Sequence, residues 1–182
     1  ADAAEPWNPT LLVGIGRGGL TPAVFLSHRM GLPLVSIDHS TKIAQFGEEL
    51  VAVLARRTRN GDRLLFVEDI NDSGKTIGEI RAALAAEGAV DAHIRFAVLI
   101  DNALSAQRVE YRARTIDRSV DKDWFILPWE AMAPREKLAQ RTTSQKIFRA
   151  SSLTDSIGIA RDRVPSLVLP SRRRRPPGRT RQ

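Results

Sequence analysis

Short apolar runs alternate with stretches of helical periodicity along most of the chain. The runs predict five strands, at residues 10–15, 33–38, 63–69, 93–101 and 124–129. The spacing of apolar positions predicts helices between them, at residues 20–30 and 76–88. Apolar strands that alternate with helices are typical of an α/β fold, in which helices flank both faces of a mostly parallel sheet. Ligands bind at the carboxyl ends of the strands in such sheets, so functional motifs are expected just after a strand.

The helix predicted at residues 76–88 carries signals at both of its ends. Thr76 and Glu79 stand at the spacing of a capping box, and Gly88 is a typical residue after a helix C-terminus. Residues 39–62 break the alternation, with weak periodicity followed by a mixed helical stretch. Because inserted segments beside a site often close over it, this part is predicted to form a small flap or hood.

Composition limits the classes of protein to which the chain can belong. Its 182 residues suit a single domain, and 42% hydrophobic with 27% charged residues is typical of a soluble globular protein. No run approaches the roughly 18 apolar residues of a membrane span, and no signal-peptide pattern is visible, so a cytoplasmic location is expected. The sequence contains no cysteine, which excludes disulfides, zinc–thiolate sites and thiol nucleophiles.

Positive charge is concentrated at the end of the sequence. The net charge is +7, and residues 171–182 hold six arginines and no acid, which leaves +1 for residues 1–170. We therefore predict a folded domain over residues 1–135 and a C-terminal extension over residues 136–182. The last part of that extension is predicted to be a disordered arginine-rich tail. Contact with nucleic acid is expected only through this tail.

A glycine-rich turn follows the first predicted strand. Gly14, Gly16 and Gly19 form the pattern G-x-G-x-x-G, and Asp38 ends the next apolar run. This layout is typical of a dinucleotide-binding fingerprint, in which the acid binds a ribose hydroxyl. The motif alone therefore leaves two hypotheses open: a nicotinamide-dependent oxidoreductase, or a turn that holds some other phosphate.

A second candidate phosphate loop follows the third predicted strand. The strand ends in Glu68 and Asp69, and Asp72 precedes the run Ser73-Gly74-Lys75-Thr76 at the start of a helix. Hydroxyl groups, a glycine and the unpaired N–H groups of a helix start together favour phosphate binding. A nucleoside-triphosphate P-loop is excluded because Asp69 stands where its first glycine belongs. The remaining alternative is a solvated turn with an ordinary helix cap.

These motifs carry a resemblance to a known family. The order of strand, two acids, two residues and D-S-G-x-T resembles the phosphoribosyl pyrophosphate (PRPP) signature of the type I phosphoribosyltransferases. The segment 13–19 is then similar to the pyrophosphate loop of that family. The stretch "WFILPWE", residues 124–130, resembles a segment of the xanthine-guanine branch. The oxidoreductase hypothesis accounts for Gly14 to Asp38 but leaves the other two motifs unexplained.

The resemblance implies an activity and its partners. It implies a Mg²⁺-dependent enzyme that transfers the phosphoribosyl group of PRPP to xanthine, guanine or hypoxanthine, releasing pyrophosphate and acting in purine salvage. Relatives of this kind usually associate as dimers or tetramers. The alternative is a regulatory or nucleotide-binding protein on the same fold, without catalysis.

The resemblance also implies a role for individual residues. Glu68 and Asp69 would bind the ribose hydroxyls and Mg²⁺, and Asp72 would be the general base that takes the proton from N7 of the purine. It also implies a cis peptide bond at Gly16–Arg17. The PRPP-binding residues would be Arg17, Gly18, Gly19, Glu68, Asp69, Asp72, Ser73, Gly74, Lys75 and Thr76.

Three residues are assigned to the purine. Trp124 would stack on the base, and the backbone around Phe125 would read its edge. Asn102 stands at the end of a predicted strand where the family usually has a lysine that donates to the 6-oxo group. An amide can still donate a hydrogen bond there, but without a charge. The alternative for Trp124 and Trp129 is that both simply fill the core.

Overall fold

A five-stranded sheet forms the centre of the molecule. The computed structural model describes residues 1–38, 46–122, 124–129 and 145–147, with residues 46–48, 124 and 145–147 described by their backbone alone. The strand order is β2-β1-β3-β4-β5, and all four pairings are parallel. These strands are β1 (Leu11–Ile15), β2 (Leu34–Ile37), β3 (Leu64–Asn71), β4 (Ile94–Asn102) and β5 (Tyr111–Ile116).

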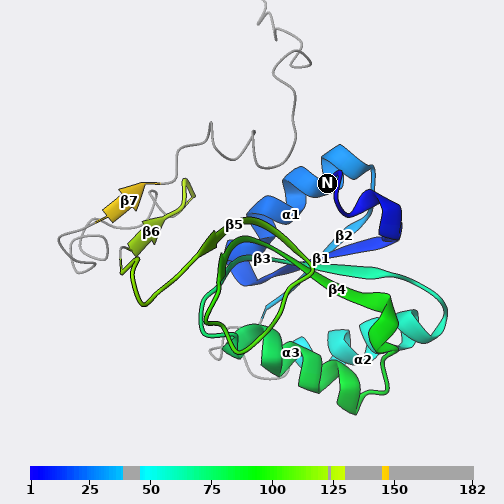
Figure 1. Cartoon of the computed structure of the whole chain (residues 1–182). Coiled ribbons are helices and arrows are strands. Elements are labelled where there is room, and N and C mark those ends of the chain that lie inside the picture. The colour runs from blue at the N-terminus through cyan, green and yellow to red at the C-terminus, as the bar shows by residue number, and fades with distance from the viewer. Residues whose placement is uncertain (39–45, 123, 130–144, 148–182) are drawn as a thin grey trace, which may run out of the picture.

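Helices cover both faces of the sheet. Helix α1 lies on one face, and α2 and α3 lie on the other (Figure 1). The helices are α1 (Gly16–Met30), α2 (Phe46–Arg59) and α3 (Lys75–Ala86), with short 3-10 helices at Glu5–Trp7 and Asp91–His93. This arrangement confirms the predicted α/β class with a parallel sheet between two helical layers.

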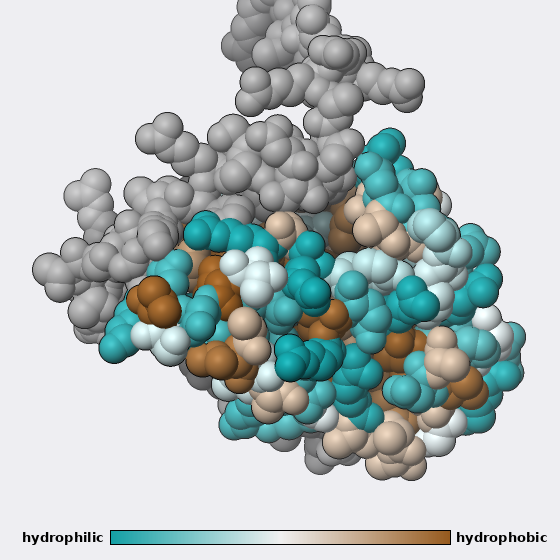
Figure 2. Space-filling model, in the orientation of Figure 1, coloured by the Kyte–Doolittle hydropathy of each residue, from teal (hydrophilic) through white to brown (hydrophobic). Residues whose placement is uncertain are grey.

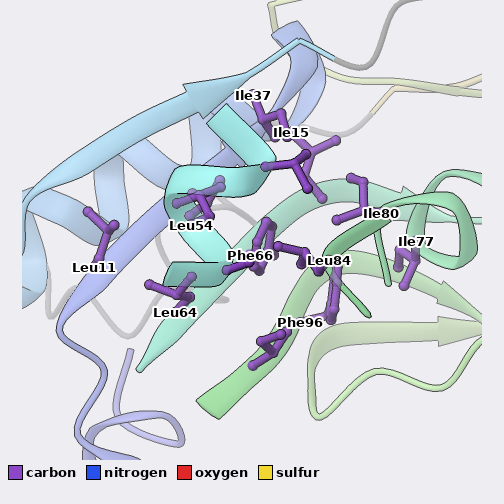
Figure 3. Packing of buried hydrophobic residues seen from close by; sticks show 14 of the residues in the cluster. Leu11, Ile15, Ile37, Leu54, Leu64, Phe66, Ile77, Ile80, Leu84 and Phe96 are labelled. Carbon is purple, nitrogen blue, oxygen red and sulfur yellow. The ribbon is translucent and has the colours of Figure 1, made fainter. Parts of the chain in front are cut away.

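Two hydrophobic clusters hold the layers together. The larger one joins the sheet to α2 and α3, where Leu54, Ile80 and Leu84 pack over Phe66 and Phe96 (Figure 3). The two phenylalanine rings stack with their centroids 5.1 Å apart. The second cluster lies on the α1 face and includes residues far along the chain, among them Phe125 and Leu127. The segment after β5 is therefore anchored to the same face of the sheet as α1.

Three strands differ from the prediction. Strand β5 was not predicted, because it is an edge strand whose middle positions are exposed and carry arginines, so it has no apolar run. Strand β6 (Trp124–Ile126) is shorter than the predicted 124–129 and lies outside the main sheet. It pairs with β7 (Gln145–Ile147) in a separate two-stranded parallel sheet (Figure 1). Pro128, which has no N–H to donate, stands just beyond its end.

Helix boundaries also differ in detail from the prediction. Helix α1 begins at Gly16, inside the glycine-rich turn, rather than at residue 20. The predicted capping box is wrong, because α3 begins at Lys75 behind Gly74, and Glu79 instead lies 3.8 Å from the ammonium of Lys75. The predicted C-terminal glycine is confirmed: Gly88 has a left-handed backbone with φ of 71°, and its N–H donates to the carbonyl of Ala85.

The surface is mixed in character. On the face shown in Figure 2, hydrophilic residues alternate with separate groups of hydrophobic ones. None of the helices in the described part of the chain has the length and hydrophobicity required to span a membrane. The start of the predicted flap, 39–45, and most of the predicted extension, including the tail 171–182, lie outside the described residues.

Candidate active site

The two glycine-containing motifs meet at the carboxyl ends of β1 and β3. These strands are neighbours in the sheet, with Gly14 opposite Val67. At Gly19, a Cβ atom would overlap the carbonyl oxygen of Val67. At Gly18 it would overlap the carboxylate of Asp69. Because only glycine leaves room for this approach, the first turn of α1 lies directly against the two acids that end β3.

The turn into α1 is made by glycine rather than by a cis peptide. Every peptide bond in the described residues is trans, so the cis bond expected at Gly16–Arg17 is absent. Gly16 has a φ of 55°, in the left-handed region that glycine adopts without strain, at the point where the chain passes from β1 into the helix. Arg17 is exposed on the first helical turn, next in the chain to Gly18.

Glu68 and Asp69 form a close pair of carboxyl groups. Glu68 is buried at 9% exposure, and its Oε1 accepts a hydrogen bond from the backbone N–H of Asp69 at 3.0 Å. The Oδ1 atom of Asp69 accepts one from the N–H of Ile70 at 2.7 Å. Burial, together with the charge of Asp69 and a hydrogen bond to its side chain, raises the pKa of Glu68 to about 9.

The acid pair fits a hard divalent cation. The carboxyl groups of Glu68 and Asp69 supply oxygen atoms of the type that Mg²⁺ prefers, and a bound cation would favour the ionised form of Glu68. Within the described residues, no group of three or more His, Cys, Asp or Glu side chains could enclose a metal. A cation here would therefore be held by one or two carboxylates and would take its other ligands from water and a bound phosphate compound, as is usual for Mg²⁺.

The loop between β3 and α3 surrounds a cavity of about 340 Å³. The cavity is lined by the ten consecutive residues 68–77, which include both acids and the predicted phosphate-binding run. Ser73, Lys75 and Thr76 lie at its rim, and the Oγ atom of Ser73 accepts a hydrogen bond from the N–H of Lys75 at 3.3 Å. Hydroxyl groups, an ammonium group and the start of a helix thus meet around a space of the size that small ligands occupy.

Gly74 is required by both its conformation and its surroundings. Its φ is 86°, and a Cβ atom would come within 2.7 Å of the backbone nitrogen of Gln107 and 2.8 Å of Ser105 Oγ. The carbonyl of Ser73 also accepts a hydrogen bond from the N–H of Ala106 at 3.2 Å. The phosphate loop is therefore supported from behind by the segment between β4 and β5.

A buried polar network beneath the loop was not predicted from the sequence. The Nδ2 atom of Asn71 donates to Asp101 Oδ1 at 2.8 Å and to the carbonyl of Gln107 at 2.9 Å, and Ser105 Oγ donates to Asn71 Oδ1 at 2.8 Å. Asn71, Asp101 and Ser105 are all buried. The available signal was a polar residue at the end of each of two adjacent apolar strands, which places the two side chains next to each other.

Asp72 is held by two side chains from the end of the sheet. Its Oδ1 atom accepts hydrogen bonds from Asn102 Nδ2 at 3.3 Å and from Arg118 Nε at 3.1 Å. Asn102 Nδ2 also donates to the backbone carbonyl of Asp72 at 3.1 Å. Its Oδ1 accepts from the N–H groups of Leu104 and Arg118, each at 3.2 Å. The amide predicted to contact the purine is thus engaged within the protein, between the phosphate loop and the end of β5.

Arg118 is the residue of this site that sequence reasoning missed. It lies in the turn directly after β5, the strand that was not predicted, and no motif contains it. Besides Asp72, its guanidinium lies over the ring of Phe125, with the carbon at the guanidinium centre 5.2 Å from the ring centroid. Phe125, which was predicted to contact the purine, is buried at 6% exposure. Because Arg118 contacts both residues, Phe125 and Asp72 lie against the same guanidinium.

The two tryptophans of the third motif have different positions. Trp124 begins β6, and its side chain lies outside the described part of the structure. Trp129 is half-buried and packs against the hydrophobic cluster on the α1 face. The alternative that the motif fills the core is thus confirmed for Trp129, whereas stacking of Trp124 on a base stays a prediction.

Comparison with known proteins assigns the family. Residues 2–132 match the model of the phosphoribosyl transferase domain. The chain belongs to this family. The match contains both loops, the acid pair and the turn that carries Arg118, and it removes the basis for an oxidoreductase.

Individual relatives are consistent with this assignment. An adenine phosphoribosyltransferase of Frankia casuarinae is 30% identical over 98 residues. That match covers 48% of this chain and 52% of the relative, so the chain spans about half the length of the curated relative. The crystal structure of a purine phosphoribosyltransferase from Pyrococcus horikoshii is 26% identical, with a TM-score of 0.55 over 73% of this chain and 85% of that one. A xanthine-guanine-hypoxanthine phosphoribosyltransferase of Helicobacter pylori shares the fold, with 16% identity and a TM-score of 0.50 over 76% of this chain and 88% of the other.

Proposed function

We propose that the protein is a Mg²⁺-dependent phosphoribosyltransferase that joins a 6-oxopurine to PRPP. One observation carries this proposal: the acid pair, Asp72 and the phosphate loop line one cavity, and the first turn of α1 closes on the acids from the neighbouring strand. A diphosphate ester of a sugar phosphate needs this combination of groups, since it presents phosphates at both ends and hydroxyls between them.

The two loops divide the substrate between them. Ser73 to Thr76 would enclose the 5′-phosphate, because hydroxyl groups and a helix start favour a dianion. Arg17 and the N–H groups of Gly18 and Gly19 would hold the pyrophosphate, for which a guanidinium is a bidentate partner. Glu68 and Asp69 lie between the two loops, where the ribose hydroxyls would reach them. Mg²⁺, when bound at these carboxylates, would neutralise charge on the departing pyrophosphate.

Catalysis in this site depends on position and charge. A ring nitrogen of the base forms a bond to C1 of the ribose while the bond from C1 to the pyrophosphate oxygen breaks, and the pyrophosphate leaves with the bonding electrons. The carboxylate of Asp72 would receive the proton that N7 loses and would stabilise positive charge on the sugar before that. Asn102 and Arg118 fix the orientation of this carboxylate. No covalent enzyme intermediate is needed, in keeping with the absence of cysteine.

Adenine is the second candidate base. It is favoured by the relative from Frankia casuarinae, which is an adenine phosphoribosyltransferase. The 6-oxopurine proposal is supported instead by Asn102 and Arg118, the hydrogen-bond donors beside Asp72. A 6-oxo group accepts hydrogen bonds from such donors, whereas a 6-amino group is itself a donor. A non-catalytic regulatory protein is the remaining alternative, and it would bind PRPP or a nucleotide without turnover.

The test is an assay of nucleotide formation. The purified full chain would be incubated with PRPP, Mg²⁺ and each of xanthine, guanine, hypoxanthine and adenine, with and without EDTA. The proposal predicts turnover that requires Mg²⁺ and is faster with a 6-oxopurine than with adenine. Faster turnover with adenine would refute the choice of base. Binding of PRPP without turnover of any base would support the regulatory alternative.

A further inference from the structure

We propose that Arg118 is the residue that selects a 6-oxopurine. This inference rests on the proposed function, and it assigns to Arg118 the donor role that the resemblance placed on the strand end occupied by Asn102. It is carried by one juxtaposition, in which the guanidinium of Arg118 contacts both Asp72 Oδ1 and the ring of Phe125.

Asn102 is committed to other partners. Its amide nitrogen donates to the carbonyl and to the Oδ1 atom of Asp72, at 3.1 and 3.3 Å. Its oxygen accepts two backbone N–H groups, those of Leu104 and Arg118. To donate to a bound base, the Asn102 amide would have to give up hydrogen bonding to Asp72. The link through Asn102 between the phosphate loop and the turn after β5 would then be lost. The role of Asn102 is therefore to hold Asp72 and the backbone of Arg118 in fixed positions relative to each other.

Arg118 lies in a hydrogen-bonded turn. Asp117 accepts hydrogen bonds from the N–H and the hydroxyl of Ser119 at 2.8 and 2.6 Å, and its carbonyl accepts one from Asp121 at 2.7 Å. The Arg118 side chain is 21% exposed, so it is mostly enclosed but reaches the surface of the site. Its Nη1 atom donates to the carbonyl of Asp121 over 3.4 Å, which is a long bond that a better acceptor can replace.

The chemistry of a purine relates these positions to the 6-substituent. N7 and the 6-position share one edge of the base, on which a 6-oxo group presents an acceptor. If Asp72 faces N7, the group beside Asp72 along that edge faces the 6-position. Arg118 is such a group, since its Nε lies 3.1 Å from Asp72 Oδ1. The guanidinium above Phe125 is also suited to a planar ligand.

A guanidinium discriminates between oxygen and nitrogen at that position. It has five N–H donors and no acceptor, so it can bind a 6-oxo group but not a 6-amino group, which is itself a donor. A site that presents only donors leaves one of them without a partner when adenine binds, and that cost reduces its affinity. Arg118 therefore favours guanine, hypoxanthine and xanthine over adenine.

The experiment compares two variants of Arg118 with a matched control. R118M removes the donors, and R118K keeps one charged donor. R114M is the control, because Arg114 lies 5.7 Å from the same Phe125 ring and is not hydrogen-bonded to Asp72 in the structure. For each full-length variant, kcat/KM is measured with hypoxanthine and with adenine, and PRPP affinity is measured by calorimetry. The affinities for IMP and AMP are determined in the same way.

The expected result is a change in base preference. In R118M, kcat/KM for adenine falls about 10-fold, because Asp72 loses one partner that orients it, whereas that for hypoxanthine falls a further 10-fold or more, to about 100-fold in all, because the hydrogen bond to the 6-oxo group is also lost. R118K recovers part of the loss, and R114M keeps the wild-type ratio. An equal loss with both bases would overturn the proposal and show that Arg118 acts only by orienting Asp72.

Failure of the proposed function is a separate outcome. A wild-type protein that binds PRPP but turns over no base would refute the proposed function, and the binding data would still test Arg118. In that case the proposal requires R118M to reduce the preference for IMP over AMP by at least about 10-fold, since one charged hydrogen bond is lost. An unchanged IMP-to-AMP ratio in R118M would overturn it.

Discussion

Asn102 and Asp72 are joined by two hydrogen bonds, one to the backbone carbonyl and one to the side chain of Asp72. The distances are 3.1 and 3.3 Å, and both bonds come from the same amide nitrogen. Asn102 belongs to the end of β4, whereas Asp72 begins the phosphate loop after β3. The end of β4 therefore positions the proposed general base, which follows the neighbouring strand β3. This makes Asn102 a positioning residue.

N102A should impair catalysis more than it impairs PRPP binding. Loss of the amide leaves Asp72 without one of its two side-chain partners, and we expect kcat to fall about 10-fold, equivalent to about 1.4 kcal/mol. The dissociation constant of PRPP should change less than about 3-fold, since Ser73 to Thr76 are untouched. Steady-state kinetics with PRPP titration measure both. N60A, at an exposed asparagine after α2, is the control and should behave as wild type.

D72N should abolish most of the transfer. The amide keeps the shape of the side chain but cannot accept the proton of N7, so we expect kcat to fall at least about 100-fold with PRPP binding retained. Rapid-quench measurement of the chemical step distinguishes this from slow product release. Full activity in D72N would exclude Asp72 as the base.

G74A should disrupt the phosphate loop. Alanine at a φ of 86° is strained, and its Cβ would press on Gln107 and Ser105, so we expect a loss of more than about 2 kcal/mol in unfolding free energy and weaker PRPP binding. G61A separates the two causes. Gly61 has a similar φ of 93° but open space around its Cβ, so that variant carries the backbone strain alone. Urea denaturation should show a clearly larger loss for G74A than for G61A.

The pH dependence of stability should report on Glu68. Its pKa is raised to about 9 in the folded protein, from an ordinary value of 4.5. Between these values the folded state binds a proton that the unfolded state has released, so the free energy of unfolding decreases as pH rises. The contribution is complete below pH 4.5 and is lost as pH passes through 9.

E68Q removes this dependence because glutamine does not titrate. In metal-free protein, the stability of E68Q relative to wild type should therefore increase steadily from pH 5 to pH 9, as measured by urea denaturation at each pH. E87Q, at the exposed residue that follows α3, is the control and should show a constant difference. A constant difference for E68Q would contradict the raised pKa.

N71A should destabilise the fold through the network under the loop. Removing this amide leaves the buried groups of Asp101 and Ser105 without a shared partner, at a cost of about 2–4 kcal/mol. Differential scanning calorimetry should show a Tm lower by about 5–10 °C, the shift expected for such a loss in a domain of this size. S73A, in the exposed part of the loop, is the comparison and should leave Tm nearly unchanged.

The sequence by itself determined the layers and the chemical groups of the site. Apolar strands alternating with helices produce a parallel sheet because each strand must be buried on both faces. The acids at residues 68 and 69 and the run 72–76 were identified because they follow an apolar strand and precede a helix. These are local signals, in which the residues that matter are close together in the chain.

Only the tertiary structure decided how distant segments complete the site. Arg118 meets Asp72 because β5 joins the edge of the sheet, and an exposed edge strand rich in arginine has no apolar pattern to reveal it. Gly18 approaches Asp69 because β1 and β3 are neighbours, which depends on the strand order rather than on either segment. Pairing between strands is a long-range choice that burial and hydrogen bonding of the whole sheet determine, so periodicity along one segment does not contain it.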